Sequence, residues 1–190
     1  MIINSLLGIN VFENSLNEEV CSEIKSKVQQ YINTNKVTVD GDQLKLVRTT
    51  YSENSNFIEE INSLELHNFI IESCEYFLIQ LGVNFEYKIH SWLNVYDNKM
   101  QMQPHCHYNS LISGCYYVSI PNDSCGEFYI PEHIEQREQY RAINGMKLEN
   151  ISYMPKEGTI LLFEPWMKHG VLANTTTEPR ISIAFNAFRT

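Results

Sequence analysis

The sequence lacks any apolar run near the roughly 18 residues that a membrane-spanning helix needs. Residues 1–8 contain neither the basic stretch nor the small-residue cleavage site of a secretory signal. We therefore expect a soluble, cytoplasmic protein that has no membrane as a partner.

The sequence also lacks Cys-x-x-Cys pairs and has fewer basic than acidic residues. The five cysteines are an odd number, and none lies in a Cys-x-x-Cys pair, which argues against a disulfide framework and a structural zinc knuckle. Lysine and arginine number 14 against 23 aspartate and glutamate residues, so the net charge is −9. Because such a surface repels phosphate backbones, we do not expect nucleic acid as a partner.

What the sequence contains fits one folded domain. Its 190 residues are 43% hydrophobic and 12% aromatic, which suffices for a sizeable core. The first half has helical periodicity and the second half has short strands. We expect a single domain over 1–190, with a mainly helical support region at 1–83 and a β-rich core at 84–190.

In the first half, the spacing of apolar residues predicts two helices. One covers roughly 15–33, after a short apolar stretch from Ile2 to Phe12. The other covers Ser55 to Leu81 and ends at Gly82, which is typical of a helix C-terminus. Between them, Asn33 to Arg48 predicts a turn or hairpin.

The second half contains about seven short runs rich in Tyr, Ile, Val and Phe, separated by turn residues. No helical crossovers separate them, so they predict a sandwich, barrel or jelly roll and not a parallel sheet. A polar insertion is expected at 131–147. The predicted strands are Phe85–Tyr96, Leu111–Ile120, Gly126–Ile130, Ile151–Met154, Thr159–Phe163, Gly170–Leu172 and Arg180–Phe188.

Three histidines of the β-rich half are candidate metal ligands. His105 and His107 are two residues apart, so in an extended segment both side chains point to the same face. His169 follows the predicted strand Thr159–Phe163 and a turn. Histidine pairs also occur in loops by chance, and a lone histidine is more often structural. The order along the chain of His-x-His, then His169, then Arg-x-Ser beginning at Arg180 favours a metal site.

The last predicted strand alternates in character. Ile181, Ile183 and Phe185 face one way, whereas its other face is formed by Arg180, Ser182, Ala184 and Asn186. A charged face of small residues beside apolar strands is typical of a pocket that holds an anion, because a buried guanidinium needs a carboxylate-like partner.

Four stretches together resemble a known family: Ser91–Tyr96, Pro104–Val118, Gly158–Val171 and Arg180–Asn186. They are similar to the iron(II)- and 2-oxoglutarate-dependent oxygenases. More narrowly, they resemble a small phage-encoded or bacterial branch in which His-x-His is followed by a Ser-Gly-x-Tyr-Tyr strand. The resemblance covers roughly residues 84–190.

The resemblance implies a mostly β, α+β fold: a double-stranded β-helix, or cupin-like jelly roll, backed by helices. It implies Fe²⁺, 2-oxoglutarate and O₂ as cofactor and cosubstrates. His105 matches the first ligand of the family motif, His169 matches the distal ligand, and Arg180 matches the residue that pairs with the far carboxylate of 2-oxoglutarate. The remaining candidates for the cosubstrate pocket are Ser182, Asn94, Tyr96 and Tyr117.

His107 departs from the wider family, which has a carboxylate at that position. Either His107 is a third ligand, or water takes the position, or an acid such as Glu127 or Glu164 approaches the metal. We favour His107 as the ligand.

The expected function is oxidation of a C–H bond, by hydroxylation, with conversion of 2-oxoglutarate and O₂ to succinate and CO₂. The primary substrate is either a small molecule or a protein side chain, and the sequence does not distinguish them. It also does not determine whether the chain assembles as a homodimer. One rival is a cupin-type metal protein, although cupins usually add a Glu soon after His-x-His, where this chain has residues 109–112 without one. Another is a non-catalytic jelly-roll module.

Overall fold

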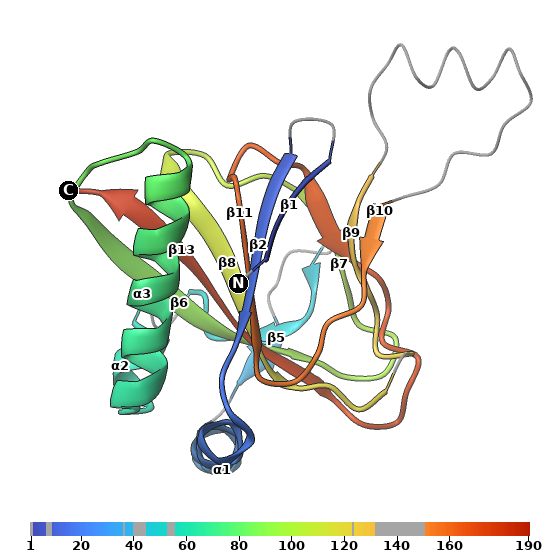
Figure 1. The fold of residues 1–190 in the computed structure, drawn as a ribbon. Coiled ribbons are helices and arrows are strands. Elements are labelled where there is room, and N and C mark those ends of the chain that lie inside the picture. Colours follow the sequence, from blue (N-terminus) through green and yellow to red (C-terminus); the bar gives the residue numbers. More distant parts are fainter. Residues whose placement is uncertain are drawn as a thin grey trace, which may run out of the picture.

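The computed structural model describes residues 2–6, 9–35, 37–39, 45–52, 56–122, 124–131 and 151–190. Their strands form two antiparallel sheets, and the helices lie outside them (Figure 1). Residues 36 and 40–44 of the expected turn or hairpin at 33–48, and residues 132–147 of the expected insertion, lie outside the described residues.

The larger sheet is built around three ten-residue strands. β13 pairs with β6 from Arg180↔Tyr96 to Arg189↔Tyr87, and on its other side it pairs with β8. In the described part of the chain the sheet has eight strands, in the order β1 (Ile2–Leu6), β2 (Ile9–Ser15), β11 (Thr159–Phe163), β8 (Ser110–Ser119), β13 (Arg180–Arg189), β6 (Tyr87–Tyr96), β5 (Arg48–Thr49) and β3 (Thr38–Val39).

The smaller sheet has five strands among the described residues, in the order β10 (Ile151–Tyr153), β9 (Phe128–Ile130), β12 (His169–Val171), β7 (Gln101–His105) and β4 (Lys45–Leu46). Figure 1 shows it on the side of the larger sheet opposite α3 (Leu64–Gln80). This arrangement confirms the predicted β-rich, jelly-roll fold.

The helices differ from the prediction at one point. α1 (Glu18–Thr34) agrees with it, and begins where the Asn17 side chain accepts a hydrogen bond from the Val20 amide at 3.0 Å. The second predicted helix is instead two, α2 (Phe57–Glu60) and α3. Asn62 has a φ of +48°, which ends the first helix, and Ser63 caps the second.

The expectation of a mainly helical region at 1–83 is wrong at its start, because β1 and β2 lie there. β2 pairs with β11 from Ser15↔Thr159 to Val11↔Phe163 and so extends the larger sheet. Phe12 packs into the main core, while its neighbour Val11 packs with Phe163 on the opposite face. β7 was also not predicted, since it contains two glutamines and Pro104.

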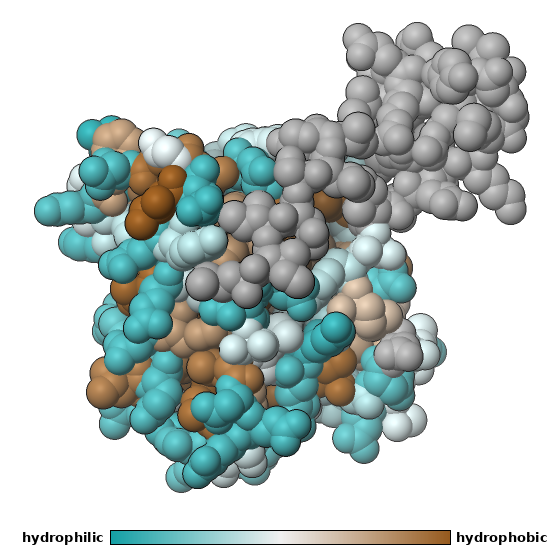
Figure 2. Space-filling model, in the orientation of Figure 1, coloured by the Kyte–Doolittle hydropathy of each residue, from teal (hydrophilic) through white to brown (hydrophobic). Residues whose placement is uncertain are grey.

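The core lies between the helices and the larger sheet. Fully buried side chains of α3, such as Ile70 and Phe77, share one cluster with Tyr116 of β8 and Ile183 of β13. The described part of the face seen in Figure 2 is mostly hydrophilic, with smaller hydrophobic areas between hydrophilic residues. In the described part of the chain, no helix has the length and apolar character needed to span a membrane.

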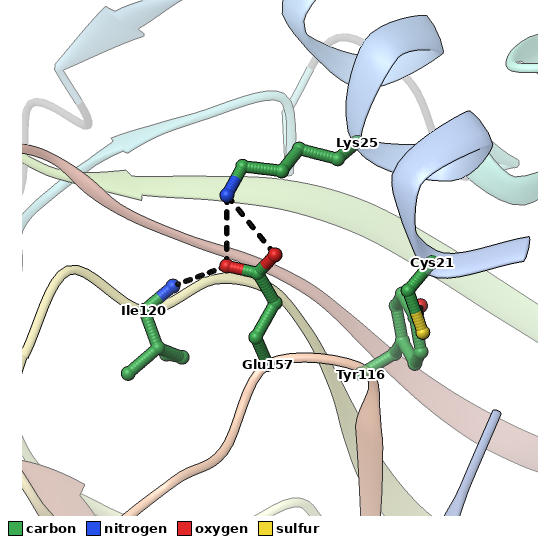
Figure 3. A network of polar contacts seen from close by, with 5 residues as sticks. All are labelled: Cys21, Lys25, Tyr116, Ile120 and Glu157. Atoms are coloured by element: carbon green, nitrogen blue, oxygen red, sulfur yellow. Dashed lines mark hydrogen bonds and ion pairs between the residues drawn. The ribbon is translucent and has the colours of Figure 1, made fainter. Parts of the chain in front are cut away.

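Polar contacts attach α1 to the end of the larger sheet (Figure 3). Lys25 donates to both carboxylate oxygens of Glu157, at 3.0 and 2.8 Å, and the Ile120 amide also donates to Glu157. Beside them, the Tyr116 hydroxyl donates to Cys21 Sγ at 3.7 Å. Because the Lys25–Glu157 pair is exposed, we attribute to it only a small part of the stability.

Gly158 gives a test of this attachment. Its φ is +79°, and a Cβ there would lie 2.4 Å from Cys21 Sγ, whereas Gly82, with φ +69°, has open space around it. Gly82→Ala should cost about 1–2 kcal/mol for the left-handed backbone alone. Gly158→Ala should cost about 1–2 kcal/mol more, because Cys21 must move. Urea unfolding measures both, and equal losses would contradict this account.

Candidate active site

The structure brings the three candidate histidines together. His105 ends β7 and His169 begins β12, and the two strands pair with His169 opposite His105. His107 follows two residues after His105, and its amide donates to the Pro165 carbonyl at 3.0 Å. One nitrogen from each ring lies within 4.8 Å of the others, so the three can hold one metal ion.

Backbone carbonyls orient two of the rings. His105 Nδ1 lies 2.9 Å from the Gln103 carbonyl oxygen, and His169 Nδ1 lies 2.8 Å from that of Met167. A carbonyl only accepts hydrogen bonds, so both Nδ1 atoms carry the hydrogen, and in the neutral form of each ring Nε2 keeps a lone pair. This is the arrangement that metal-binding histidines require, and imidazole nitrogen suits Fe²⁺.

His169 is 5% exposed and is held in its neutral form. Burial lowers the pKa of its imidazole well below the ordinary value of 6.5, and positive charge on His105 and His107 would lower it further, against a smaller opposing effect of the Met167 carbonyl. A neutral imidazole is the form that binds metals.

No carboxylate joins the three histidines among the residues that the structure describes. Glu164, one of the two acids considered from the sequence, instead accepts from the Asn10 amide at 3.4 Å and from its side chain at 3.3 Å. The other, Glu127, does not line the cavity that contains the histidines. The assignment of His107 as third ligand stays a prediction.

The same cavity, of about 210 Å³, holds all the residues predicted for the cosubstrate pocket. Arg180 and Ser182 reach it from β13, as the alternation of that strand predicted. From the two neighbouring strands come Asn94, Tyr96 and Tyr117.

Arg180 is a buried cation without a carboxylate partner in the described structure. It is 1% exposed, and its guanidinium carbon lies 5.3 Å from the ring centres of both Tyr96 and Tyr117. One terminal nitrogen donates to the Gly126 carbonyl at 2.7 Å, while Nε has no hydrogen-bond partner among the described residues. Since an isolated buried charge is costly, this geometry fits a carboxylate ligand.

Other buried polar atoms of the pocket also lack hydrogen-bond partners in the part of the chain that the structure describes. They are Asn94 Oδ1 and the Tyr117 hydroxyl. Burial raises the pKa of the Tyr117 hydroxyl well above its ordinary value, partly opposed by the positive Arg180. Both groups are therefore available to a polar ligand.

Three residues of the site were not among the predicted site residues. Cys115 lines the cavity, and burial raises the pKa of its thiol, against the opposing effect of Arg180. Asn186 Nδ2 lies 3.2 Å from His107 Nδ1, and its Oδ1 accepts from the Ser113 hydroxyl at 2.7 Å. The alternation of β13 already placed Asn186 on the face of Arg180, and that signal could have identified it.

A family model described as "Putative 2OG-Fe(II) oxygenase" matches residues 90–186, a little over half of the chain. This segment includes the three histidines, Arg180 and Asn186. Among curated proteins, none matches the sequence.

Several solved structures share the fold. A Pseudomonas putida prolyl-4-hydroxylase is similar over 95% of this chain and 92% of its own, with 9% identity and a TM-score of 0.68. The epimerase SnoN from nogalamycin biosynthesis, solved with Fe³⁺ and α-ketoglutarate, is similar over 94% and 78%, with 11% identity and a TM-score of 0.72. HygX from Streptomyces hygroscopicus, with nickel and 2-oxoglutarate, is similar over 96% and 83%, with 12% identity and a TM-score of 0.64.

The neutral His169 predicts a pH effect on the metal-free protein. The unfolded chain takes up a proton on this residue below pH 6.5 and the folded chain does not, so the free energy of unfolding falls as the pH drops. The loss from pH 7.5 to pH 5.5 should be on the order of 1 kcal/mol. Urea unfolding in the presence of a chelator should show that His169→Gln removes it. His67→Gln, at an exposed position of α3, should retain it, and a His169→Gln protein with the parent's pH dependence would contradict the prediction.

Proposed function

Since the chain belongs to the 2-oxoglutarate- and iron(II)-dependent oxygenases, whose family model matches residues 90–186, we propose that it is a hydroxylase. One oxygen atom of O₂ would enter succinate, formed with CO₂ from 2-oxoglutarate, and the other would enter a C–H bond of the primary substrate. The observation that carries the proposal is Arg180, a buried cation without a carboxylate partner in the described structure, in one cavity with the three histidines.

The three histidines would hold the iron through their Nε2 atoms, which in His105 and His169 point away from the carbonyl-bound Nδ1. Bound there, Fe²⁺ supplies the activation of O₂ and the chelation of the 2-oxo acid. Three neutral imidazoles leave the charge of the ion uncompensated, so the site favours an anionic cosubstrate.

The far end of 2-oxoglutarate would be held by Arg180. Its guanidinium offers an unpartnered Nε, and Ser182, two residues along the same face of β13, adds a hydroxyl. Tyr96 and Tyr117, both nearly fully buried, form walls that exclude water and so strengthen the charge pair. Asn94 Oδ1 and the Tyr117 hydroxyl complete the polar lining.

The primary substrate would approach past Trp92 and Tyr51. Both line the cavity, their rings meet edge to face at 4.9 Å, and Trp92 lies 6.4 Å from the His107 ring. Tyr51 is 55% exposed, so the cavity reaches solvent on this side. A small molecule and a protein side chain both fit such an opening.

The proposal retains the expectations from the sequence about the reaction, the location and the partners of the protein. Hydroxylation is supported by the prolyl hydroxylases among the similar structures. A cytoplasmic location is supported by the five free cysteines. The net charge of −9 argues against nucleic acid as a partner, and a homodimer stays open.

The function is tested by the dependence of 2-oxoglutarate binding on the metal. Because the cosubstrate would have contacts to the ion itself, anaerobic calorimetry should show tight binding only with Fe²⁺ or Mn²⁺ present. In air, the iron-loaded protein should convert 2-oxoglutarate to succinate. Equal affinity with and without metal, or no succinate from iron-loaded protein, would overturn the proposal.

Arg180→Ala should weaken 2-oxoglutarate binding by on the order of 2–5 kcal/mol, because the far carboxylate would be buried without a partner. Iron content should remain that of the parent, since Arg180 is not part of the histidine cluster. Arg189→Ala, at the opposite end of β13 where the side chain stacks on Phe85, is the matched control and should bind normally. Unchanged binding by Arg180→Ala would show that the carboxylate is held elsewhere.

A further inference from the structure

We propose that Asn174 is a positioning residue for Arg180, and that through Arg180 it determines how tightly the protein binds the far carboxylate of 2-oxoglutarate. Asn174 does not line the cavity and would not touch the cosubstrate. The inference rests on the proposed role of Arg180 and goes beyond it, because it places a determinant of cosubstrate affinity outside the binding pocket.

Asn174 lies in the loop that joins β12 to β13, residues 172–179. The loop has exposed residues on both sides of Asn174, which is itself fully buried. Its Nδ2 donates at 2.8 Å to the carbonyl oxygens of both Tyr96 and Glu178, and its Oδ1 accepts from the Thr176 amide at 2.9 Å. Because carbonyls only accept and a backbone amide only donates, these contacts fix the orientation of the Asn174 side chain.

The two carbonyls that Asn174 binds belong to the segments that carry Arg180 and one of its aromatic neighbours. Glu178 precedes Arg180 by two residues, with Pro179 between them. Tyr96 ends β6 and is paired with Arg180, which begins β13, and the Tyr96 ring centre lies 5.3 Å from the guanidinium carbon. The pairing of β13 with β6 stops at these two residues. The Asn174 amide therefore joins the two strand ends just beyond their last pair.

The same loop also holds the backbone group to which Arg180 donates. Thr175 donates to the Ser124 carbonyl through its amide and its hydroxyl, both at 2.9 Å. Two residues after Ser124, the Gly126 carbonyl accepts from Arg180 at 2.7 Å. A Cβ at Gly126 would overlap the Leu172 carbonyl oxygen, so the two segments are in close contact. The loop thus contacts Arg180's hydrogen-bond acceptor as well as its aromatic neighbour.

Arg180 needs this support because no ion pair orients it in the described structure. A guanidinium and a carboxylate form paired hydrogen bonds only at set distances and in a set relative orientation. Without the Asn174 amide, the strand end that carries Arg180 and the ring beside it would lose their common attachment. A binding site whose supporting contacts are loosened in this way loses affinity although its own residues are unchanged.

The metal end of the cavity should respond differently. β12 and β7 pair with His169 opposite His105 at one end of the pair, whereas the loop that contains Asn174 follows the other end of β12. A change at Asn174 is therefore expected to alter cosubstrate binding and to leave metal binding as it is.

The first test is anaerobic calorimetry of Asn174→Ala. The Mn²⁺-loaded variant should bind 2-oxoglutarate about tenfold more weakly than the parent, since residues of one hydrogen-bond network are coupled to about this extent. Its affinity for Mn²⁺ alone should equal that of the parent. Should Asn174→Ala fail to fold, Asn174→Ser takes its place.

Ser91→Ala is the matched control. Ser91 is also buried, and its hydroxyl accepts from the Ile58 amide at 3.0 Å, on β6 but outside the cavity. This variant should lose stability in urea unfolding and still bind 2-oxoglutarate as the parent does. Equal losses of 2-oxoglutarate affinity in Ser91→Ala and Asn174→Ala would show a general loosening of the fold and would overturn the inference.

A double-mutant cycle shows whether Asn174 acts through Arg180. In the Arg180→Ala protein, Asn174→Ala should cause no further loss of 2-oxoglutarate affinity, because the group that it positions is absent. 2-Oxopentanoate, which has the same 2-oxo acid group and no far carboxylate, should bind equally to the parent and to Asn174→Ala. A full additional loss in the Arg180→Ala protein, or weaker binding of 2-oxopentanoate by Asn174→Ala, would contradict the inference.

Arg180→Ala separates failure of this inference from failure of the proposed function. If Arg180→Ala weakens 2-oxoglutarate binding while Asn174→Ala does not, Asn174 is not a positioning residue and the proposed function stands. If Arg180→Ala binds 2-oxoglutarate as the parent does, the carboxylate is held elsewhere, and the role of Arg180 and the inference fall together. If the metal-loaded parent does not bind 2-oxoglutarate, the proposed function itself falls.

Discussion

The pairing of β13 with β6 along its whole length, and with β8 on its other side, is the constraint on which the site depends. Over its ten residues β13 presents Arg180, Ser182 and Asn186 on one face, at a spacing fixed by the strand. The part of the cavity lined by Arg180 and Ser182 is thus set by one strand. Ile181, Ile183 and Phe185, on the opposite face, pack into the core beneath the helices. Because the two faces of a strand point in opposite directions, packing against α3 also fixes the direction of the polar side chains.

The metal centre needs a second constraint, which the smaller sheet supplies. His105 and His169 are far apart in the chain and become neighbours because β7 and β12 pair. Gly170, beside His169, has a Met102 carbonyl within 2.8 Å of where a Cβ would be, so the two strands approach closely only with glycine there. Two independent strand pairings therefore meet at one cavity.

The sequence was most informative where a pattern repeats over several residues. Alternation along 180–186 predicted the polar face of β13, and helical spacing predicted α1. It was least informative for short or polar strands: β7 contains Pro104 and two glutamines. The break at Asn62 needs a left-handed backbone, which periodicity does not reveal. That Glu127 and Glu164 lie outside the histidine cluster depends on long-range contacts.

The buried guanidinium of Arg180 has a consequence for the lifetime of the protein in the cell. In the proposed complex a carboxylate would offset the cost of burying this charge, and a ligand that binds only the native state raises the free energy of unfolding with the logarithm of its concentration. Unfolded chains are what proteases degrade. The abundance of this protein would then follow the supply of 2-oxoglutarate, which would link its turnover to the carbon metabolism of the cell.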